Sequence, residues 1–179
     1  MTLTEPVAAR PLTARDPRLA PWRAFLLAHA RVSRRLDEEL RAEHDLSFAE
    51  YDALLTIAQA PERRIRMGLL AEEVLLSKSG VTRLIDRLVN DGLVERSACL
   101  ADARGAEAVL TSRGLDRLRA ASQTHLRGIS EHFLAVMDDA SLETLERSMT
   151  AVARQAGPGQ GDPGACVTDV PDLPTPIAH

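Results

Sequence analysis

The sequence is poor in aromatic residues, which make up only 3% of its 179 residues, although 45% of the residues are hydrophobic. Strands favour aromatic and β-branched residues, whereas leucine and alanine, which dominate the apolar residues here, favour helices. The hydrophobic content is sufficient for a core, and the length suits one domain with tails. The sequence therefore predicts a mainly α protein built around a single domain.

Long hydrophobic runs and cysteine pairs are also missing. No run of about 18 apolar residues occurs, so we expect no membrane span, and no basic segment followed by an apolar stretch marks a signal peptide. Cys99 and Cys166 give neither a disulfide framework nor a zinc-binding spacing. No nucleophile–base pair, phosphate loop or metal cluster has a useful spacing. We therefore expect a cytoplasmic protein that is not an enzyme and that holds no cofactor or metal.

Positive charge is scarce overall, because the formal net charge is −4, but it is unevenly distributed. Residues 61–119 contain 11 basic and 9 acidic residues, which leaves this stretch at +2 and the rest of the chain at −6. Phosphate binding depends on the local field and not on the total charge. The small excess makes this stretch the part of the chain best suited to nucleic acid.

The stretch from Leu76 onward carries the most informative pattern. Four apolar residues recur at steps of three and four and so share one helical face, namely Val81, Leu84, Ile85 and Leu88. Ser77 suits an N-cap, and Gly92 stands where helices commonly end in a left-handed residue. The other face carries groups suited to base edges and phosphates, namely Ser79, Thr82, Arg83, Asp86, Arg87 and Asn90. Taken alone, this face fits a solvated amphipathic helix equally well.

A predicted hairpin follows this helix and favours DNA binding. Residues 94–98 and 106–110 can pair across a loop in which Gly105 permits a positive φ. Arg104 lies near the tip, and Asp102 can hold its guanidinium in one direction. A helix followed by a hairpin with a basic tip is typical of a winged helix, whose helix enters the major groove while the wing reaches the minor groove.

These motifs together resemble the MarR family of bacterial winged helix-turn-helix regulators. The resemblance covers about residues 22–155 and implies a small β-hairpin wing and long helices that form a dimerisation platform. It rests on Gly92-Leu93-Val94-Glu95-Arg96, on Asp102-x-Arg104 followed by Ala108-Val109-Leu110-Thr111-x-x-Gly114, on Met67-Gly68-Leu69-Leu70-Ala71 and on Ser79-x-Val81-Thr82-Arg83.

The rest of the chain is organised around this domain. Residues 1–21 contain four prolines, and we expect a flexible arm with a short helix between Leu12 and Leu19. Residues 156–179 are rich in glycine and proline, and we expect a disordered acidic tail. Within the MarR-type domain, the expected dimerisation helices span residues 22–44 and 111–155, and the winged helix-turn-helix spans residues 47–110.

Local signals predict several element ends. Ser47 and Glu50 form a capping box, flanked by Leu46 and Tyr51 as a hydrophobic staple, and the helix that follows ends before Pro61. Other expected elements are an edge strand at residues 65–67, a helix capped by Gly68 through Val74, a helix capped by Thr111 that runs toward Val136, and a last helix capped by Ser141.

The resemblance implies a homodimeric, sequence-specific DNA-binding regulator, for which we predict a ligand-responsive repressor acting on a pseudo-palindromic operator. We expect Ser79, Thr82 and Arg83 to reach base edges and Arg104 to enter the minor groove. Phosphate contacts are expected from Lys78, Arg87 and Arg96. The full set expected at the DNA is Ser77, Lys78, Ser79, Thr82, Arg83, Arg87, Arg96, Asp102 and Arg104.

The effector site is less well defined by the sequence. Trp22 and His29 share a face of the first long helix and are candidates for binding an aromatic ligand, since some relatives use a tryptophan for this purpose. The alternative is that Trp22 belongs to the interface core. His125 and His132 lie two turns apart, about 10.5 Å along a helix, which is too far for one metal ion.

A competing hypothesis keeps the fold and the dimer but not the operator. In it, the chain is a small-molecule or redox sensor, or an interaction module, that does not bind DNA. The candidate redox thiol is Cys99, which lies near Arg96 and could have a lowered pKa. The alternative for Cys99 is an inert, partly buried thiol.

Overall fold

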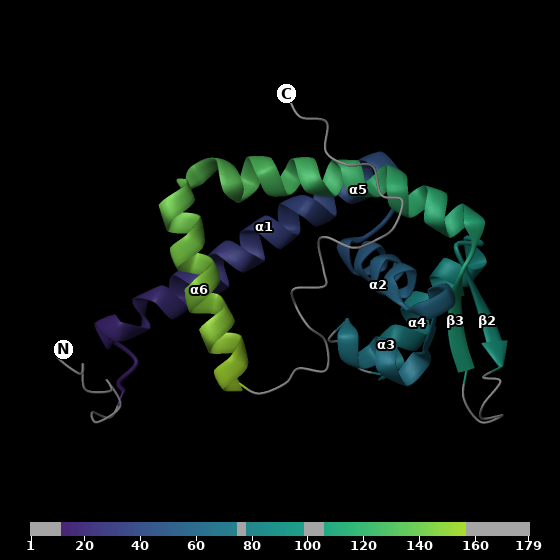
Figure 1. Cartoon of the computed structure of the whole chain (residues 1–179), viewed down its shortest axis with the longest axis horizontal. Coiled ribbons are helices and arrows are strands. Elements are labelled where there is room, and N and C mark those ends of the chain that lie inside the picture. The colour runs from purple at the N-terminus through teal and green to yellow at the C-terminus, as the bar shows by residue number, and fades with distance from the viewer. Residues whose placement is uncertain (1–11, 75–77, 99–105, 157–179) are drawn as a thin grey trace.

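The computed structural model describes residues 12–74, 78–98 and 106–156 and confirms a mainly helical protein with a small sheet (Figure 1). Helices α1 and α5 pack along each other, and α2, α3, α4 and the strands form a lobe at one end. The elements in chain order are η2 (Pro17–Leu19), α1 (Ala20–His44), α2 (Phe48–Gln59), η3 (Pro61–Arg63), β1 (Arg64–Arg66), α3 (Met67–Glu73), α4 (Lys78–Asn90), β2 (Val94–Ala98), β3 (Ala106–Leu110), α5 (Ser112–His132), η4 (Leu134–Val136) and α6 (Asp139–Ala156).

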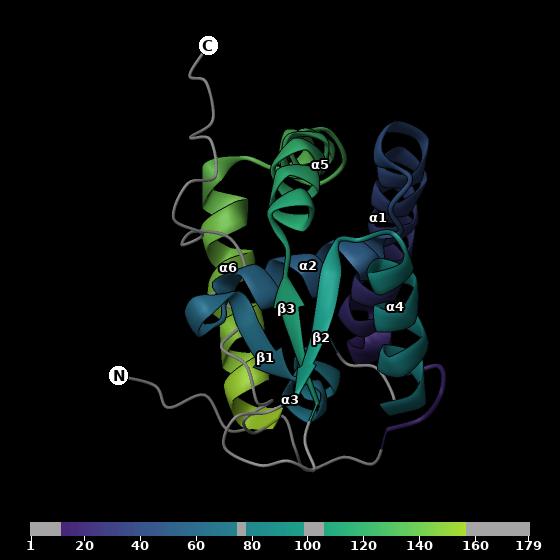
Figure 2. The ribbon, with the colours of Figure 1, turned by 90° about the vertical axis from the view of Figure 1, so that its right-hand side faces the viewer.

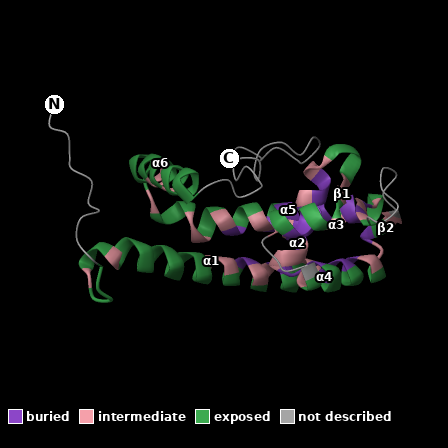
Figure 3. Ribbon diagram, turned by 90° about the horizontal axis from the view of Figure 1, so that it is seen from below, coloured by how far each residue is buried: buried purple, intermediate pink, exposed green. Residues whose placement is uncertain are grey.

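The hydrophobic core lies in the lobe and reaches the adjoining half of α5 (Figure 3). Leu54 and Ile57 of α2, Ile85 and Leu88 of α4, and Leu118 of α5 are fully buried there. In contrast, α6 has no buried residue. These elements show that the lobe has its own core, whereas α6 and much of α1 have none within one chain.

The sheet contains three antiparallel strands in the order β1-β3-β2 (Figure 2). The predicted hairpin is confirmed, because β2 and β3 pair from Val94↔Leu110 to Ala98↔Ala106. The predicted edge strand is also present, one residue earlier than expected, since Met67 already begins α3. The sheet therefore joins the wing strands to the helix-turn-helix.

Two of the predicted caps are confirmed. The backbone N–H of Ser47 donates to the Glu50 carboxylate over 2.8 Å, and the N–H of Glu50 donates to the Ser47 hydroxyl over 3.2 Å, so the capping box of α2 is complete. The hydroxyl of Thr111 accepts from the N–H of Gly114 over 2.9 Å at the start of α5. Both caps are local motifs, because each cap residue and its partner lie only three positions apart in the chain.

Three other expected helix ends are wrong. Gly68 is the second residue of α3 and not its cap, because the helix follows β1 directly with Arg66 at the N-cap position. Helix α5 ends at His132, and η4 carries the apolar periodicity on to Val136 in a 3₁₀ turn. Ser141 lies inside α6, where its N–H donates to the Asp138 carboxylate over 2.8 Å.

The short helix predicted between Leu12 and Leu19 is present only in part. A 3₁₀ turn at Pro17–Leu19 occupies the predicted short helix, and its Asp16 side chain accepts from the N–H of Arg18. Helix α1 then begins at Ala20, two residues before the expected start. The other predictions about the arm and the acidic tail fall on residues 1–11 and 157–179, outside the described residues.

Candidate nucleic-acid interface

Helix α4 separates its two faces as the sequence predicted. Val81, Leu84, Ile85 and Leu88 are all at most 2% exposed, because they pack into the core of the lobe. The residues on the opposite side are exposed, namely Ser79, Thr82, Arg83, Asp86, Arg87 and Asn90. The helix thus turns a polar surface of hydroxyls and arginines toward solvent, and α3 packs behind it.

The end of α4 is fixed against the next two elements. Gly92 has a φ of 68°, the left-handed conformation expected from the sequence, and the N–H of Leu93 donates to the carbonyl of Leu88 over 2.8 Å. The hydroxyl of Thr111 donates to the carbonyl of Gly92 over 2.8 Å. This turn therefore sets the direction of both the wing and α5 relative to α4.

An ion pair joins the wing to α4. Arg96, on β2, donates through Nη2 to the Asp86 carboxylate over 2.9 Å and to the carbonyl of Thr82 over 3.4 Å. These contacts lie on the side of the sheet where β2 adjoins α4 (Figure 2). Arg96 was expected at a phosphate, and the structure gives it a second role in holding β2 against α4.

A second ion pair joins α4 to the start of α2. Arg87 donates through Nε to Glu50 over 2.7 Å. Burial would raise the pKa of the Glu50 carboxyl, but hydrogen bonds from Ser47 and Arg87 outweigh burial and lower this pKa below its ordinary value. Glu50 is therefore an ionised partner of Arg87 at neutral pH.

The described residues place part of the predicted DNA-binding set on one surface. Ser79, Thr82 and Arg83 share the exposed face of α4, and Arg83 forms no ion pair with any residue that the structure describes. Ser77, Asp102 and Arg104 lie outside the described residues, as do Cys99 and the side chain of Lys78. The wing tip and the N-cap of α4 therefore stay predictions.

Sequence reasoning missed the carboxylates that face these arginines. Glu50 lies 37 residues before Arg87 in the chain, and the sequence had assigned Glu50 only to the capping box with Ser47. Asp86 showed no sign of its pairing with Arg96, because neither residue belongs to a spaced motif with the other. No local signal links such pairs, since the tertiary fold alone brings them together.

The predicted effector residues lie on the exposed half of α1. The rings of Trp22 and Phe25 stack with centroids 5.9 Å apart, and the rings of Phe25 and His29 lie 6.2 Å apart. Trp22 is 55% exposed. Trp22 and His29 are therefore joined through Phe25 into an aromatic row on the surface of a single chain.

The junction between the lobe and α5 contains a half-buried histidine. The ring of His125 lies 4.5 Å from that of Tyr51 and 5.7 Å from that of Phe48. Burial lowers its pKa to about 4, so the ring is neutral at pH 7. His132, two turns later, instead pairs with Glu39 over 2.6 Å. Among the described residues, no three potential ligands gather into a metal site.

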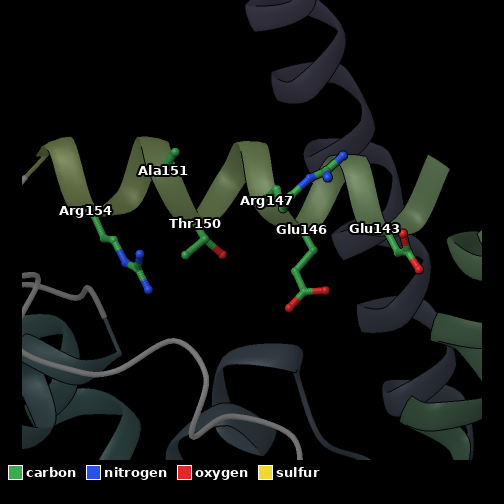
Figure 4. A pocket seen from close by; sticks show the side chains of 6 residues that line it. All are labelled: Glu143, Glu146, Arg147, Thr150, Ala151 and Arg154. Atoms are coloured by element: carbon green, nitrogen blue, oxygen red, sulfur yellow. The ribbon is translucent and has the colours of Figure 1, made fainter. Parts of the chain in front are cut away.

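An open hollow of about 450 Å³ runs along one face of α6 (Figure 4). Glu146, Thr150 and Arg154 extend from the same side of the helix and line it. Two acidic residues, Glu143 and Glu146, are followed along the hollow by two basic ones, Arg147 and Arg154, and none of the residues of α6 is buried. The face is thus a surface without a packing partner in the described chain.

The lobe is a winged helix-turn-helix, since α3 and α4 precede an antiparallel hairpin whose first strand is tied to α4. A family model described as the MarR family matches residues 44–105. This match and the solved structures reported below agree, and they support the prediction that the chain is a MarR-type transcriptional regulator. Members of this family are regulators, so the prediction that the chain is not an enzyme is confirmed.

Solved structures of MarR-family transcriptional regulators are similar over most of the chain. AbsC from Streptomyces coelicolor is 29% identical with a TM-score of 0.73, over 83% of this chain and 98% of AbsC. Sco3205 from the same organism, solved in complex with DNA, is 27% identical with a TM-score of 0.75, over 88% of this chain and 97% of Sco3205. A MarR mutant from E. coli, solved with operator DNA, is 25% identical with a TM-score of 0.68, over 78% of this chain and 99% of that chain.

No curated protein matches the chain in sequence. Among the described residues, no helix has the length and apolar character needed to cross a membrane.

Proposed function

We propose that the chain is a homodimeric, sequence-specific DNA-binding repressor that binds a pseudo-palindromic operator and is released by a small-molecule effector. The observation that carries the proposal is the polar face of α4, where Ser79, Thr82 and Arg83 are exposed above a fully buried apolar face. Relatives with the same fold were solved with DNA. A protein that acts on DNA is expected in the cytoplasm of a bacterium.

The assigned roles follow from side-chain chemistry. Arg83 offers a planar fork of donors that matches guanine in the major groove, and the hydroxyls of Ser79 and Thr82 can donate to or accept from several base edges. Phosphate contacts are assigned to Lys78, Arg87 and Arg96, with Ser77 beside them at the start of α4, because cations and hydroxyls there position the helix on the backbone. Arg104 and Asp102 would place the wing in the minor groove.

The homodimer is supported by apolar surface that a single chain leaves in water. Trp22, Phe25, Leu26 and Leu27 of α1 are all more than 40% exposed, as are Leu134, Val136 and Val152 near and in α6. Large exposed apolar side chains that gather into a patch mark interaction surfaces, and each such side chain contributes roughly 1.5–3 kcal/mol when fully buried. A second copy of this two-helix surface is its natural partner, because a two-fold interface is self-complementary.

Dimerisation determines the form of the operator. A two-fold dimer presents two α4 helices about 34 Å apart, one turn of duplex DNA, so the half-sites should be inverted repeats. An effector that binds one arrangement of the dimer better than the other shifts the population by that difference in affinity. A ligand that changes the angle between the platform and the lobe would therefore release the DNA.

Selection of duplexes from a random pool tests DNA binding directly. The wild-type chain should enrich an inverted repeat, and its affinity for that repeat should fall steeply between 50 and 200 mM salt, because phosphate contacts release counterions. A dimer that enriches no sequence and shows no salt-dependent binding would support the competing hypothesis of a sensor or interaction module without an operator.

Substitution at the wing gives a residue-level test. Arg104→Ala should weaken binding to the selected duplex by about 1–3 kcal/mol, because it removes a minor-groove contact. The dimer should persist, since the side chains expected at the dimer interface belong to α1 and α6 and not to the wing. Unchanged affinity in a titration would count against the assigned role of the wing.

The effector part can be tested through Trp22, the single tryptophan of the chain. Titration with urate, an aromatic anion, should quench its fluorescence and release the selected duplex if Trp22 and His29 bind such ligands. His29→Ala should weaken both effects together. Release of DNA without any change in fluorescence would place the effector site elsewhere, and no response to urate would exclude this ligand class at Trp22.

A further inference from the structure

Glu50 connects two structural elements with its two carboxylate oxygens. Oε2 accepts from the backbone N–H and the hydroxyl of Ser47, over 2.8 and 2.7 Å, and so caps α2. Oε1 accepts from Nε of Arg87 over 2.7 Å. The Glu50 side chain is only 12% exposed, whereas the Arg87 side chain is 58% exposed. Glu50 is thus a fixed anchor at the base of an arginine that extends into solvent.

This geometry leaves the outer part of the guanidinium available. An arginine has five N–H donors in one plane, and Arg87 uses the one on Nε for Glu50. No other hydrogen bond from Arg87 reaches a residue within the described ranges. A carboxylate on Nε fixes the plane of the guanidinium, while the two terminal nitrogens keep four donors for another anion.

The start of α2, which carries Glu50, is also hydrogen-bonded to α1. Asp37 of α1 accepts from the backbone N–H of Phe48, the first residue of α2, over 2.8 Å. The other oxygen of Asp37 accepts from Nε of Arg41 over 2.7 Å. Hydrogen bonds therefore run from α1 through the start of α2 to Glu50, and from Glu50 to α4.

We propose that Glu50 is a positioning residue for DNA binding, which aims the terminal nitrogens of Arg87 at a backbone phosphate of the operator. This inference rests on the proposed function, because it assumes that α4 meets duplex DNA. It assigns to an acidic residue a favourable contribution to binding a polyanion. If the Glu50 carboxylate is removed, the Arg87 side chain samples many rotamers in the free protein. It must then lose that freedom when the complex with DNA forms.

Glu50→Gln separates this role from simple charge repulsion. Glutamine is accepted at the third position of a capping box, so α2 stays capped, but its neutral amide binds a guanidinium less strongly than a carboxylate does. Removal of a negative charge near DNA should by itself strengthen binding. Weaker binding by Glu50→Gln is therefore the opposite of the electrostatic expectation.

The experiment measures affinity for the duplex that the wild-type chain selects from a random pool, at four salt concentrations. Glu50→Gln should bind roughly three- to tenfold more weakly, the loss expected for one hydrogen-bonded contact. The slope of log affinity against log salt should become shallower by about 0.9, the value for one phosphate contact. Arg87→Gln, which leaves the capping box untouched, should show the same two changes, and the double variant should add nothing further.

Glu73→Gln is the matched control, because Glu73 is exposed on α3 of the same lobe. It removes the same charge without touching Arg87 and should bind equally well or more tightly. Equal or tighter binding by Glu50→Gln, or additive effects in the double variant, would overturn the inference. If Glu50→Gln does not fold, an unchanged salt slope in Arg87→Gln would overturn it alone. Failure of the wild-type chain to select any duplex would instead overturn the proposed function.

Discussion

Ser47 and His125 are polar side chains placed in apolar surroundings in two different ways. The hydroxyl of Ser47 both donates and accepts at the start of α2, although the residue is only 6% exposed. Nδ1 of His125 is buried without a hydrogen-bond partner among the described residues. The first arrangement stabilises the fold over a wide pH range, whereas the second makes stability depend on the charge of the ring.

Ser47→Ala should lower the free energy of unfolding by about 1 kcal/mol, because the N–H of Glu50 loses its acceptor at the N-cap. Urea denaturation of both chains measures the difference. Ser141→Ala is the control, because Asp138 and not Ser141 supplies the cap of α6, and it should change stability by less than about 0.5 kcal/mol. Equal losses in the two variants would contradict this assignment of caps.

His125 should make the protein less stable at mildly acidic pH. Burial lowers its pKa to about 4 from the ordinary value of 6.5, so the unfolded chain binds more protons between these values. The neutral His125 ring therefore makes its full contribution to the free energy of unfolding above about pH 6.5. This contribution, on the order of 3 kcal/mol in total, is lost as the pH falls toward 4.

Urea denaturation at several pH values between 4.5 and 7.5 measures this effect. His125→Phe keeps an aromatic ring against Tyr51 and Phe48 but cannot be protonated, so its stability should fall less than that of the wild-type chain as the pH drops. Identical pH profiles for the two chains would show that His125 is protonated as easily in the folded state as in the unfolded state.

At the scale of elements, the position of α5 depends on a close approach to the turn after α4. A Cβ on Gly114 would lie 2.0 Å from the backbone carbonyl oxygen of Leu93, and backbone cannot move aside as a side chain can. A Cβ on Gly68, in contrast, would meet no atom within 4 Å. Gly68 lies in α3 of the lobe and Gly114 in the first turn of α5, and the two glycines constrain the fold to very different degrees.

Alanine substitutions at these glycines should have opposite effects. Gly68→Ala should stabilise the chain by about 0.5–1 kcal/mol, because alanine is the better helix former. Gly114→Ala should destabilise it by roughly 1–3 kcal/mol despite the same gain in helix propensity, because the new methyl group forces α5 away from Leu93. Thermal unfolding of both variants tests this contrast, and stabilisation by Gly114→Ala would show that α5 moves away at little cost.

At the scale of the whole molecule, the lobe has a complete hydrophobic core, whereas the platform formed by α1, α5 and α6 does not. The lobe buries residues of α2, α3, α4 and the sheet, whereas α6 buries none and α1 buries only Leu36 and Leu40. Polar contacts such as His132–Glu39 join α1 to α5 within the chain. The missing apolar contacts of the platform are those that the proposed second copy would supply.

Leu26→Glu should convert the proposed dimer into monomers at micromolar concentration, because it places a charge in a surface that a second chain would bury. Leu26 is 46% exposed, so the fold of one chain should survive. Leu69→Glu on α3 is the control with similar exposure, at 48%, and should stay dimeric. Sedimentation velocity distinguishes the two, and a wild-type chain that sediments as a monomer would contradict the dimer itself.

The sequence by itself determined the features that depend on neighbours a few residues apart. The buried face of α4, the capping box at Ser47, the left-handed Gly92 and the pairing of residues 94–98 with 106–110 all follow from spacing. Helix ends were harder to predict where two signals compete. At the start of α6, the cap is supplied by Asp138 and not by Ser141. At the end of α5, apolar residues continue past His132, but they form a 3₁₀ turn instead of extending the helix.

Only the tertiary structure decided which charges meet across the lobe. Glu50 faces Arg87, and Asp86 faces Arg96, because packing of α2, α4 and β2 on a shared core brings them together. It also decided that His125 is half-buried against Tyr51 and Phe48, whereas His132 pairs with the Glu39 carboxylate. Spacing along the chain fixes the face on which a side chain lies, but its partner depends on how separate elements pack, and that is a property of the core as a whole.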